Sequence, residues 1–202
     1  MADSDHSSGF ALFPTAIGTC ALAWRGDVVI ATTLPEAHEA ATRQRIAARS
    51  HGASERAPTT VIEPAVDAIT ALLAGEQVDL SFIACDLGAD DDFNARVYRI
   101  ARTIPPGATL TYGDVALRLG DKQLAQAVGR ALGRNPLPII VPCHRVLGAS
   151  GKLTGFSATG GVATKLRLLA IEGAAVGAAT SLFADLPLVV KPQPVARRSP
   201  SN

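Results

Sequence analysis

The sequence predicts an α+β protein: a small N-terminal domain of a sheet with helices, followed by a mostly helical C-terminal domain with a helix-turn-helix. Two observations predict this architecture. Apolar, β-branched runs concentrate before residue 35, whereas from Phe93 onward apolar residues recur at helical spacing between short turns. The charge also changes sign between the two halves of the 202-residue chain, which is long enough for two small domains that share an interface.

The N-terminal half contains two kinds of pattern. Residues 10–34 are expected to form strands separated by turns, and residues 78–87 a further strand. Residues 35–49, rich in Ala, Glu and Arg, are expected to form a surface helix, and residues 63–73 a second helix that ends before Gly75.

These patterns divide the chain into four segments. We expect a flexible N-terminus over residues 1–9, an α/β domain over 10–90, a helical domain over 91–176 and a disordered tail over 187–202. The tail carries Pro and Arg residues and has little apolar surface to bury.

The composition excludes several classes of protein. No stretch approaches the roughly 18 apolar residues of a membrane helix, and the N-terminus lacks the basic start and apolar core of a signal peptide. Cys20, Cys85 and Cys143 are an odd number at wide spacing, which argues against a disulfide framework. We therefore expect a cytoplasmic protein with free thiols.

The charge is distributed unevenly along the chain. Residues 1–95 contain 5 Lys and Arg against 14 Asp and Glu, whereas residues 96–172 contain 11 against 3. This asymmetry indicates either that the second half faces a polyanion or that two packed domains balance each other's charge.

A helical pair follows the first C-terminal helix, which is expected over residues 93–104 and is stopped by Pro105-Pro106-Gly107. Thr111 and Asp114 form a capping-box pattern at the start of the first helix of the pair, which closes on a glycine. The second helix, capped by Asp121, spans residues 122–134 and has an apolar stripe opposite a polar one. The polar stripe contains Gln126, Arg130 and Gly133, with Arg134 beside it. The pair is typical of a DNA-binding helix-turn-helix, or else of an ordinary helical hairpin.

Cys143 is the candidate nucleophile. It stands in Pro142-Cys143-His144-Arg145-Val146, directly after a short apolar run. A nearby imidazole and a positive charge lower the pKa of a thiol, and a water can relay a proton where adjacent side chains point apart. The alternative is a buried core cysteine beside a surface histidine. No second Cys or His stands at zinc-ligand spacing, so we predict no metal site.

One acidic residue stands at an unfavourable place. Residues 164–172 are expected to form a helix, and Glu172 is at its C-terminal end, where a negative charge opposes the helix dipole. An acid in such a position can orient a base, although chance also places glutamates there.

Together these residues resemble the O6-alkylguanine–DNA alkyltransferases, also called methylated-DNA–protein-cysteine methyltransferases. The resemblance covers about the last 80 residues before the tail, in the family's order and at nearly its spacing. The matching segments are IPPG (104–107), TYG (111–113), AVG (127–129), NP (135–136), PCHRV (142–146), the GASGKLTGF loop and LLAIEG (168–173).

The resemblance implies a mechanism. Cys143 takes the alkyl group from guanine O6 and keeps it, so that each molecule acts once. His144, through a water and oriented by Glu172, takes the thiol proton, and Tyr112 donates a hydrogen bond to the flipped base. Asn135 braces the turn that carries the cysteine.

The resemblance also implies the binding surfaces. Residues 10–90 match the family's N-terminal, ribonuclease-H-like domain weakly, and residues 91–176 are the DNA-binding and alkyl-acceptor domain. The base pocket would be formed by Val146, Phe156 and Ser157. The minor groove would be contacted by Tyr112, Gln126, Ala127, Gly129, Arg130 and Arg134. The expected partner is duplex DNA with O6-alkylguanine, bound by a monomer that needs no cofactor and no membrane.

Two positions depart from the family pattern. Gln126 stands where arginine is usual, and the loop over residues 156–161 is two residues longer than the commonest one, with Phe156 in place of tyrosine. Glutamine lacks the charge and planar fork of arginine. Gln126 leaves open a protein that recognises alkylguanine without repairing it, although the intact PCHRV segment counts against this alternative. A separate alternative is a cysteine hydrolase that acts on small substrates with multiple turnovers.

Overall fold

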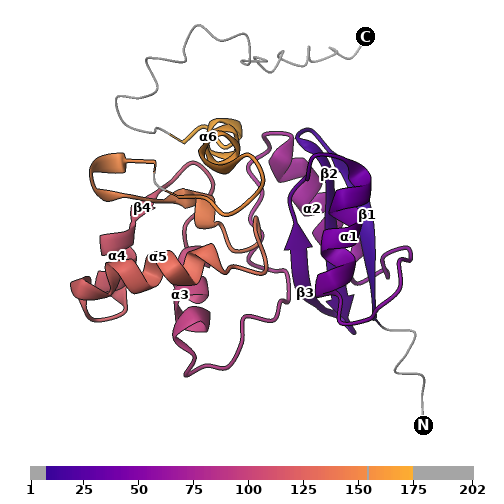
Figure 1. The fold of residues 1–202 in the computed structure, drawn as a ribbon, viewed down its shortest axis with the longest axis horizontal. Coiled ribbons are helices and arrows are strands. Elements are labelled where there is room, and N and C mark those ends of the chain that lie inside the picture. Colours follow the sequence, from indigo (N-terminus) through magenta and orange to yellow (C-terminus); the bar gives the residue numbers. More distant parts are fainter. Residues whose placement is uncertain (1–7, 154, 175–202) are drawn as a thin grey trace, which may run out of the picture.

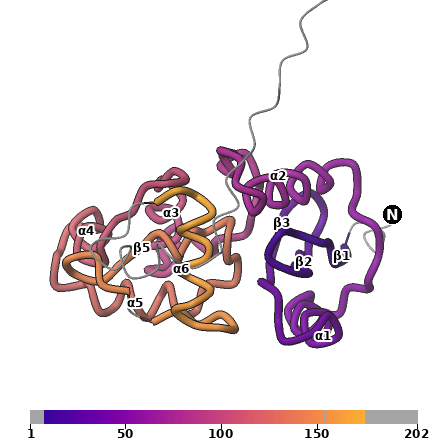
Figure 2. The backbone as a smooth tube through the Cα atoms, turned by 90° about the horizontal axis from the view of Figure 1, so that it is seen from above, coloured from indigo at the N-terminus to yellow at the C-terminus, as the bar shows by residue number. Residues whose placement is uncertain are grey.

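The computed structural model describes residues 8–153 and 155–174, and the fold is α+β as predicted. A three-stranded sheet with two helices lies beside a helical C-terminal half (Figures 1 and 2). The tail predicted over residues 187–202, residues 1–7 and the last two residues of the predicted helical domain lie outside the described residues. Within the described part of the chain, no helix has the length and apolar character needed to cross a membrane.

The N-terminal sheet is antiparallel in the order β1-β2-β3. Its strands are β1 (Ser8–Thr15), β2 (Gly18–Arg25) and β3 (Val28–Thr33). The first strand begins at Ser8, which pairs with Arg25, so the strand starts inside the segment that was expected to be flexible through residue 9. The predicted start at Phe10 is two residues late, because the apolar pattern does not mark the polar first residues of the strand.

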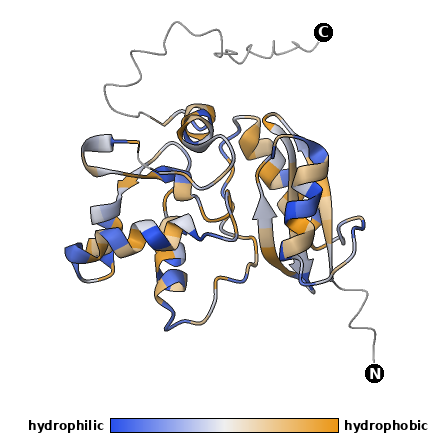
Figure 3. Cartoon of the chain, in the orientation of Figure 1, coloured by the Kyte–Doolittle hydropathy of each residue, from blue (hydrophilic) through white to orange (hydrophobic). Residues whose placement is uncertain are grey.

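Helices cover both faces of this sheet (Figure 2). They are α1 (Glu39–Arg49) and α2 (Glu63–Leu73). Successive residues of β2 point to opposite faces: Ala21 and Ala23 pack in a cluster with Ile46 of α1, whereas Leu22 and Trp24 join the main core with α2. The small alanines allow α1 to approach closely, and α1 keeps hydrophilic residues on its outer side (Figure 3).

Helix α1 starts four residues later than predicted. His38 caps it, with the Ala41 N–H donating to His38 Nδ1 at 3.1 Å. The preceding Glu36 N–H donates to Thr42 Oγ1 at 3.0 Å, so this backbone donor is satisfied outside the helix.

The strand predicted over residues 78–87 is wrong. This segment makes one isolated bridge to the sheet, in which Val29 bonds to Ala84 and Asp86. Elsewhere side chains satisfy its backbone: Asp79 Oδ1 accepts from Ser81 N–H at 2.9 Å, and Arg102 donates to three carbonyls. Those carbonyls belong to Leu80, Ser81 and Ile83. These side-chain bonds replace the ladder that a strand would need.

The C-terminal half is helical, with one short parallel strand pair. Its helices are α3 (Phe93–Arg102), α4 (Tyr112–Arg118), α5 (Ala125–Gly133) and α6 (Gly161–Ile171). The strands are β4 (Leu110–Thr111) and β5 (Val146–Leu147), and single 3₁₀ turns are η1 (Lys122–Leu124), η2 (Cys143–Arg145) and η3 (Ala149–Gly151). The buried Tyr98 hydroxyl ties α3 to α5 by donating to the Ala131 carbonyl at 3.0 Å.

The predicted helix-turn-helix is present as α4 and α5. Thr111 and Asp114 form the capping box, and Asp121 accepts from Gln123 N–H at 2.8 Å. The second predicted helix, over 122–134, divides into η1 and the shorter α5. The predicted polar stripe is solvent-exposed, and Val128 on the opposite stripe is buried.

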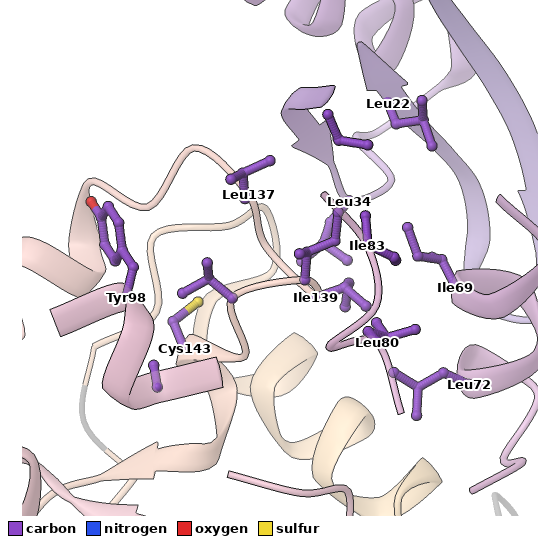
Figure 4. Packing of buried hydrophobic residues seen from close by; sticks show 14 of the residues in the cluster. Leu22, Leu34, Ile69, Leu72, Leu80, Ile83, Tyr98, Leu137, Ile139 and Cys143 are labelled. Carbon is purple, nitrogen blue, oxygen red and sulfur yellow. The ribbon is translucent and has the colours of Figure 1, made fainter. Parts of the chain in front are cut away.

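The edge of β3 binds the segment that leads to Cys143. Thr32 N–H donates to the Pro136 carbonyl at 3.0 Å, and its hydroxyl donates to the Pro138 carbonyl at 2.7 Å. Around these bonds, side chains of both halves form one core (Figure 4), in which Leu34 and Ile83 belong to the same cluster as Leu137 and Ile139. The N-terminal sheet therefore supports the cysteine segment directly.

Candidate functional site

Cys143 lies at the floor of a cleft of about 1080 Å³. It is the first residue of η2, and its exposed fraction is only 9%. One wall is the helix-turn-helix, with Tyr112, Gln126 and Arg130, and the other is the loop after η3, with Phe156 and Ser157. The structure thus brings most of the predicted pocket and DNA-binding residues around the cysteine.

The turn before Cys143 is held by Asn135. Its side-chain amide donates to the Val141 carbonyl at 2.9 Å, and its oxygen accepts from Leu137 N–H at 2.9 Å. Between these two bonds, Ile139 has a φ of 77°, an unfavourable conformation for a β-branched residue. The buried Asn135 bonds stabilise this turn and place Cys143 at its end.

Behind the cysteine, three buried side chains form a charged cluster. Glu172 Oε1 is 2.9 Å from His144 Nε2 and 2.8 Å from an Arg145 terminal nitrogen, and Glu172 Oε2 accepts from Arg145 Nε at 2.8 Å. Burial opposes ionisation of Glu172, but the hydrogen bonds from His144 and Arg145 lower its pKa to about 2. Glu172 is therefore an ionised, buried partner of both residues.

The IPPG segment completes this cluster. Arg145 also donates to the carbonyl of Ile104. Gly107 has a φ of 79°, and a Cβ there would lie 3.2 Å from the Glu172 carbonyl oxygen. A glycine at this position lets the turn approach the end of α6. The IPPG segment therefore packs against Glu172 and helps to hold it in place.

The thiol of Cys143 has an environment set by burial and by two side chains that are distant in sequence. Burial raises the pKa of the Cys143 thiol, against the opposing effects of a hydrogen bond with Asn135 and the charge of Lys165. The sequence left open whether His144 and Arg145 lie beside the sulfur or point away from it; their side chains are directed to Glu172. Adjacency in sequence did not place them beside the sulfur.

His144 has one engaged and one unengaged ring nitrogen. Burial lowers the pKa of His144, although the hydrogen bond to Glu172 opposes this shift. A neutral imidazole beside a carboxylate carries its proton on Nε2, which leaves Nδ1 as an acceptor. Nδ1 is buried and has no hydrogen-bond partner among the described residues.

Lys165 is a site residue that the sequence reasoning missed. It lies on α6, is fully buried, and donates to the Val146 carbonyl at 2.6 Å. Its ammonium is 5.8 Å from the centre of the Tyr112 ring. A signal was present: Lys165 precedes Leu168, Leu169 and Glu172 at the i+3, i+4 and i+7 spacing of one helix face.

Not every predicted residue lines the cleft. Val146 is fully buried behind it, where its N–H bonds to the Cys143 carbonyl. Arg134 is exposed after the end of α5 and lines a second, smaller cavity. Gly129 lies against Tyr112, since a Cβ at residue 129 would be 3.8 Å from that ring.

Comparison with known proteins places these features in one family. The family model described as "6-O-methylguanine DNA methyltransferase, DNA binding domain" matches residues 92–174. A methylated-DNA–protein-cysteine methyltransferase of Mycobacterium tuberculosis is 46% identical over 119 residues, which are 59% of this chain and 70% of the relative. One from Methanothermobacter thermautotrophicus is 38% identical over 120 residues, or 59% of this chain and 66% of that protein.

Solved structures agree over a longer stretch. The crystal structure of the M. tuberculosis O6-methylguanine methyltransferase has a TM-score of 0.66 at 36% identity, over 87% of this chain and 99% of that one. A structure of the M. tuberculosis protein in complex with DNA has a TM-score of 0.67 at 37% identity, with the same coverage. This chain therefore belongs to the O6-methylguanine DNA methyltransferase family, the methylated-DNA–protein-cysteine methyltransferases.

Proposed function

We propose that this chain repairs alkylated DNA by transferring the alkyl group of O6-alkylguanine to Cys143, once per molecule. The observation that carries the proposal is the position of the thiol at the floor of a cleft walled by the exposed face of a helix-turn-helix. An alkyl group inside a duplex is inaccessible to such a recessed atom, so the damaged base must leave the stack and enter the cleft.

The DNA contacts of the proposal come from α5 and Tyr112. Gln126, Gly129 and Arg130 of α5 line the cleft, with Gln126 and Arg130 exposed. Ala127 is outside the cleft lining and half-buried, and its small size, like that of Gly129, allows a close approach to a groove. The excess of basic residues in this half supplies attraction to phosphates. Arg134, after the end of α5, extends this surface.

The reaction needs a thiolate and a stabilised leaving group. Through a water, the thiol proton passes to Nδ1 of His144, whose Nε2–H stays bound to Glu172. The sulfur then attacks the alkyl carbon; the S–C bond forms as the C–O6 bond breaks. Tyr112 donates a hydrogen bond to the departing guanine, and the proton that His144 took from the thiol finally passes to the guanine anion. Thiol and alkylguanine are thereby converted into thioether and guanine.

Two further residues act on Cys143 in this proposal. Asn135 positions the turn and forms a hydrogen bond that favours the thiolate. The positive charge of Lys165 also favours the thiolate. The same ammonium lies near the Tyr112 ring, so Lys165 is close to both the nucleophile and the residue that bonds the base. Phe156 and Ser157 form the wall that faces the alkyl group and determine which sizes fit.

We also propose that the chain acts as a monomer in the cytoplasm. The acceptor must remain a reduced thiol, and Cys20, Cys85 and Cys143 are all free in the structure. The residues that line the cleft and the His144–Glu172 pair behind Cys143 fit together within this chain, which supports the monomer.

Intact-protein mass spectrometry tests this function. After incubation with a duplex that contains one O6-methylguanine, the chain is expected to gain about 14 Da, located at Cys143 and limited to one addition per molecule. Retained binding to the damaged duplex without a mass gain would instead support recognition without repair. Repeated turnover on one chain would support a hydrolase.

Substitution Gln126→Arg is expected to increase the rate of repair by about tenfold, equivalent to about 1.4 kcal/mol of barrier. The charged guanidinium makes stronger hydrogen bonds to the DNA than a neutral amide and has the planar fork that can occupy the space of the flipped base. Single-turnover transfer of the methyl group from a labelled duplex measures the effect. The control is Gln123→Arg, which adds the same charge at an exposed position of η1. An equal increase in the transfer rate of both variants would mean that added charge alone causes the effect.

A further inference from the structure

A second cavity, of about 100 Å³, lies where the N-terminal domain meets the cysteine segment. It adjoins the main cleft, since Cys143 and Phe156 line both. Its other walls come from the end of β3, from α1 and from the residues after α5. The reaction proposed above makes no use of this cavity.

The lining of this cavity carries an excess of positive charge. Arg45 and Arg49 come from α1 and Arg134 from the end of α5, and Glu36 is the one carboxylate among the described lining residues. Glu36 is already engaged, with one oxygen 2.7 Å from Arg45 and the other accepting from the Thr159 hydroxyl. The charge of Glu36 therefore offsets one of the three positive charges, and the described lining keeps a net positive charge.

Arg49 is poorly compensated for its position. Its side chain is half-buried, and its hydrogen bond to the Thr32 carbonyl is long, at 3.4 Å. Burial and the neighbouring charge of Arg45 both lower the pKa of Arg49. A half-buried guanidinium with these neighbours gains from an anion.

The same wall of the cavity contains a neutral donor, the hydroxyl group of Thr33. The hydroxyl of Thr33 is buried, since this residue is 3% exposed, and it has no hydrogen-bond partner among the described residues. Buried hydroxyl groups are nearly always bonded, because leaving one unbonded costs stability. Thr33 lines the cavity, so an oxyanion there could accept from both Thr33 and Arg49.

We propose that this cavity binds a phosphate group, held by Arg45, Arg49 and Arg134 and by the hydroxyl of Thr33. Guanidinium groups and a hydroxyl donor are the usual partners of phosphate oxygens, and the volume admits one such group but no nucleoside. The phosphate belongs either to the backbone of bound DNA or to a free anion. Only the first source rests on the proposed function.

A bound phosphate connects parts of the chain that otherwise meet only at the domain interface. It would join α1 of the N-terminal domain to the end of α5 and to the Phe156 loop, beside Cys143. Since Arg45 and Arg49 are on α1, the N-terminal domain gains a direct part in anion binding, although its own charge is strongly acidic.

The test compares Arg49→Gln with Arg43→Gln, an arginine on the same helix that pairs with Glu39 and Glu55 away from the cavity. Tm is measured in inorganic phosphate and in chloride at equal ionic strength. Affinity for an undamaged duplex is measured against salt concentration, so that neither readout depends on alkyl transfer. We expect phosphate to raise the Tm of the wild type and of Arg43→Gln, and this shift to be lost in Arg49→Gln.

The salt dependence separates the two sources. If the phosphate comes from DNA, Arg49→Gln lowers the slope of log affinity against log salt by about 0.9 relative to Arg43→Gln. If it is a free anion, the slope stays equal and only the Tm shift is lost. Equal shifts and equal slopes in Arg49→Gln and Arg43→Gln would overturn the proposal.

Thr33→Val keeps the proposal testable should Arg49→Gln fail to fold. This substitution removes the unpartnered hydroxyl, so the Tm in chloride is expected to stay equal or rise while the phosphate-dependent shift becomes smaller. An undiminished phosphate shift in Thr33→Val would remove the threonine from the site and contradict the proposal as stated.

Discussion

Replacing Cys143 by alanine is expected to abolish alkyl transfer completely while leaving binding to the damaged duplex intact. The sulfur is the atom that forms the new bond in the proposed reaction, and no other thiol lines the cleft in the described part of the chain. The cleft wall that faces DNA, with Gln126 and Arg130, is unchanged by the substitution. Intact mass and duplex affinity are measured on the same preparation.

Cys85→Ala is the matched control. Cys85 is also a free thiol, but it lies in the segment that bridges to β3, and burial raises its pKa. The control is expected to accept one methyl group like the wild type. A mass gain in Cys143→Ala, or its loss in Cys85→Ala, would move the acceptor to another residue and refute the assignment of Cys143.

Local chemistry explains which parts of the fold the sequence predicted well. The helix-turn-helix was predicted from a capping box and from Asp121, and both caps form because their hydrogen bonds join residues two or three apart. The strands within residues 10–34 were likewise predicted from local apolar runs. Boundaries failed where capping used an unusual residue, as with His38 at the start of α1.

Long-range contacts explain what the sequence could not predict. Residues 78–87 have a strand-like composition, but Arg102 of α3 satisfies their carbonyls, and nothing in the segment itself signals this partner. The Cys143 environment is another case: the side chains of Asn135 and Lys165 act on the thiol, whereas the adjacent His144 acts on it through its backbone and turns its side chain to Glu172. The bond between Glu36 and Thr159 joins residues 123 apart.

Only the family resemblance predicted that Cys143, His144 and Glu172 act together in one site. The isolated patterns were compatible with a buried cysteine and an incidental glutamate. The structure adds the physical relation, since Glu172 bonds both residues that follow the cysteine. His144 and Glu172 are 28 positions apart in the sequence, so no local pattern can reveal that they are bonded.

Replacing Glu172 by glutamine is expected to lower the free energy of unfolding at pH 7 by about 3–5 kcal/mol, because one partner of a buried ion pair is lost. The variant keeps an oxygen that can accept from His144 but leaves the charge of Arg145 buried without its carboxylate. Urea unfolding measures the difference. Glu76→Gln, at an exposed position, is the control and is expected to change stability by less than about 0.5 kcal/mol.

The pH dependence of this loss identifies its electrostatic origin. The pKa of Glu172 is about 2 in the folded chain against an ordinary 4.5, so folding favours the deprotonated form. Its stabilisation is complete above pH 4.5 and is lost as the pH falls towards 2. Protonation of His144, whose pKa is also lowered, penalises folding below pH 6.5 in both proteins. The gap between wild type and Glu172→Gln should therefore narrow below pH 4.5. A gap of constant size down to the lowest pH at which both proteins fold would mean that Glu172 stabilises by packing and not by charge.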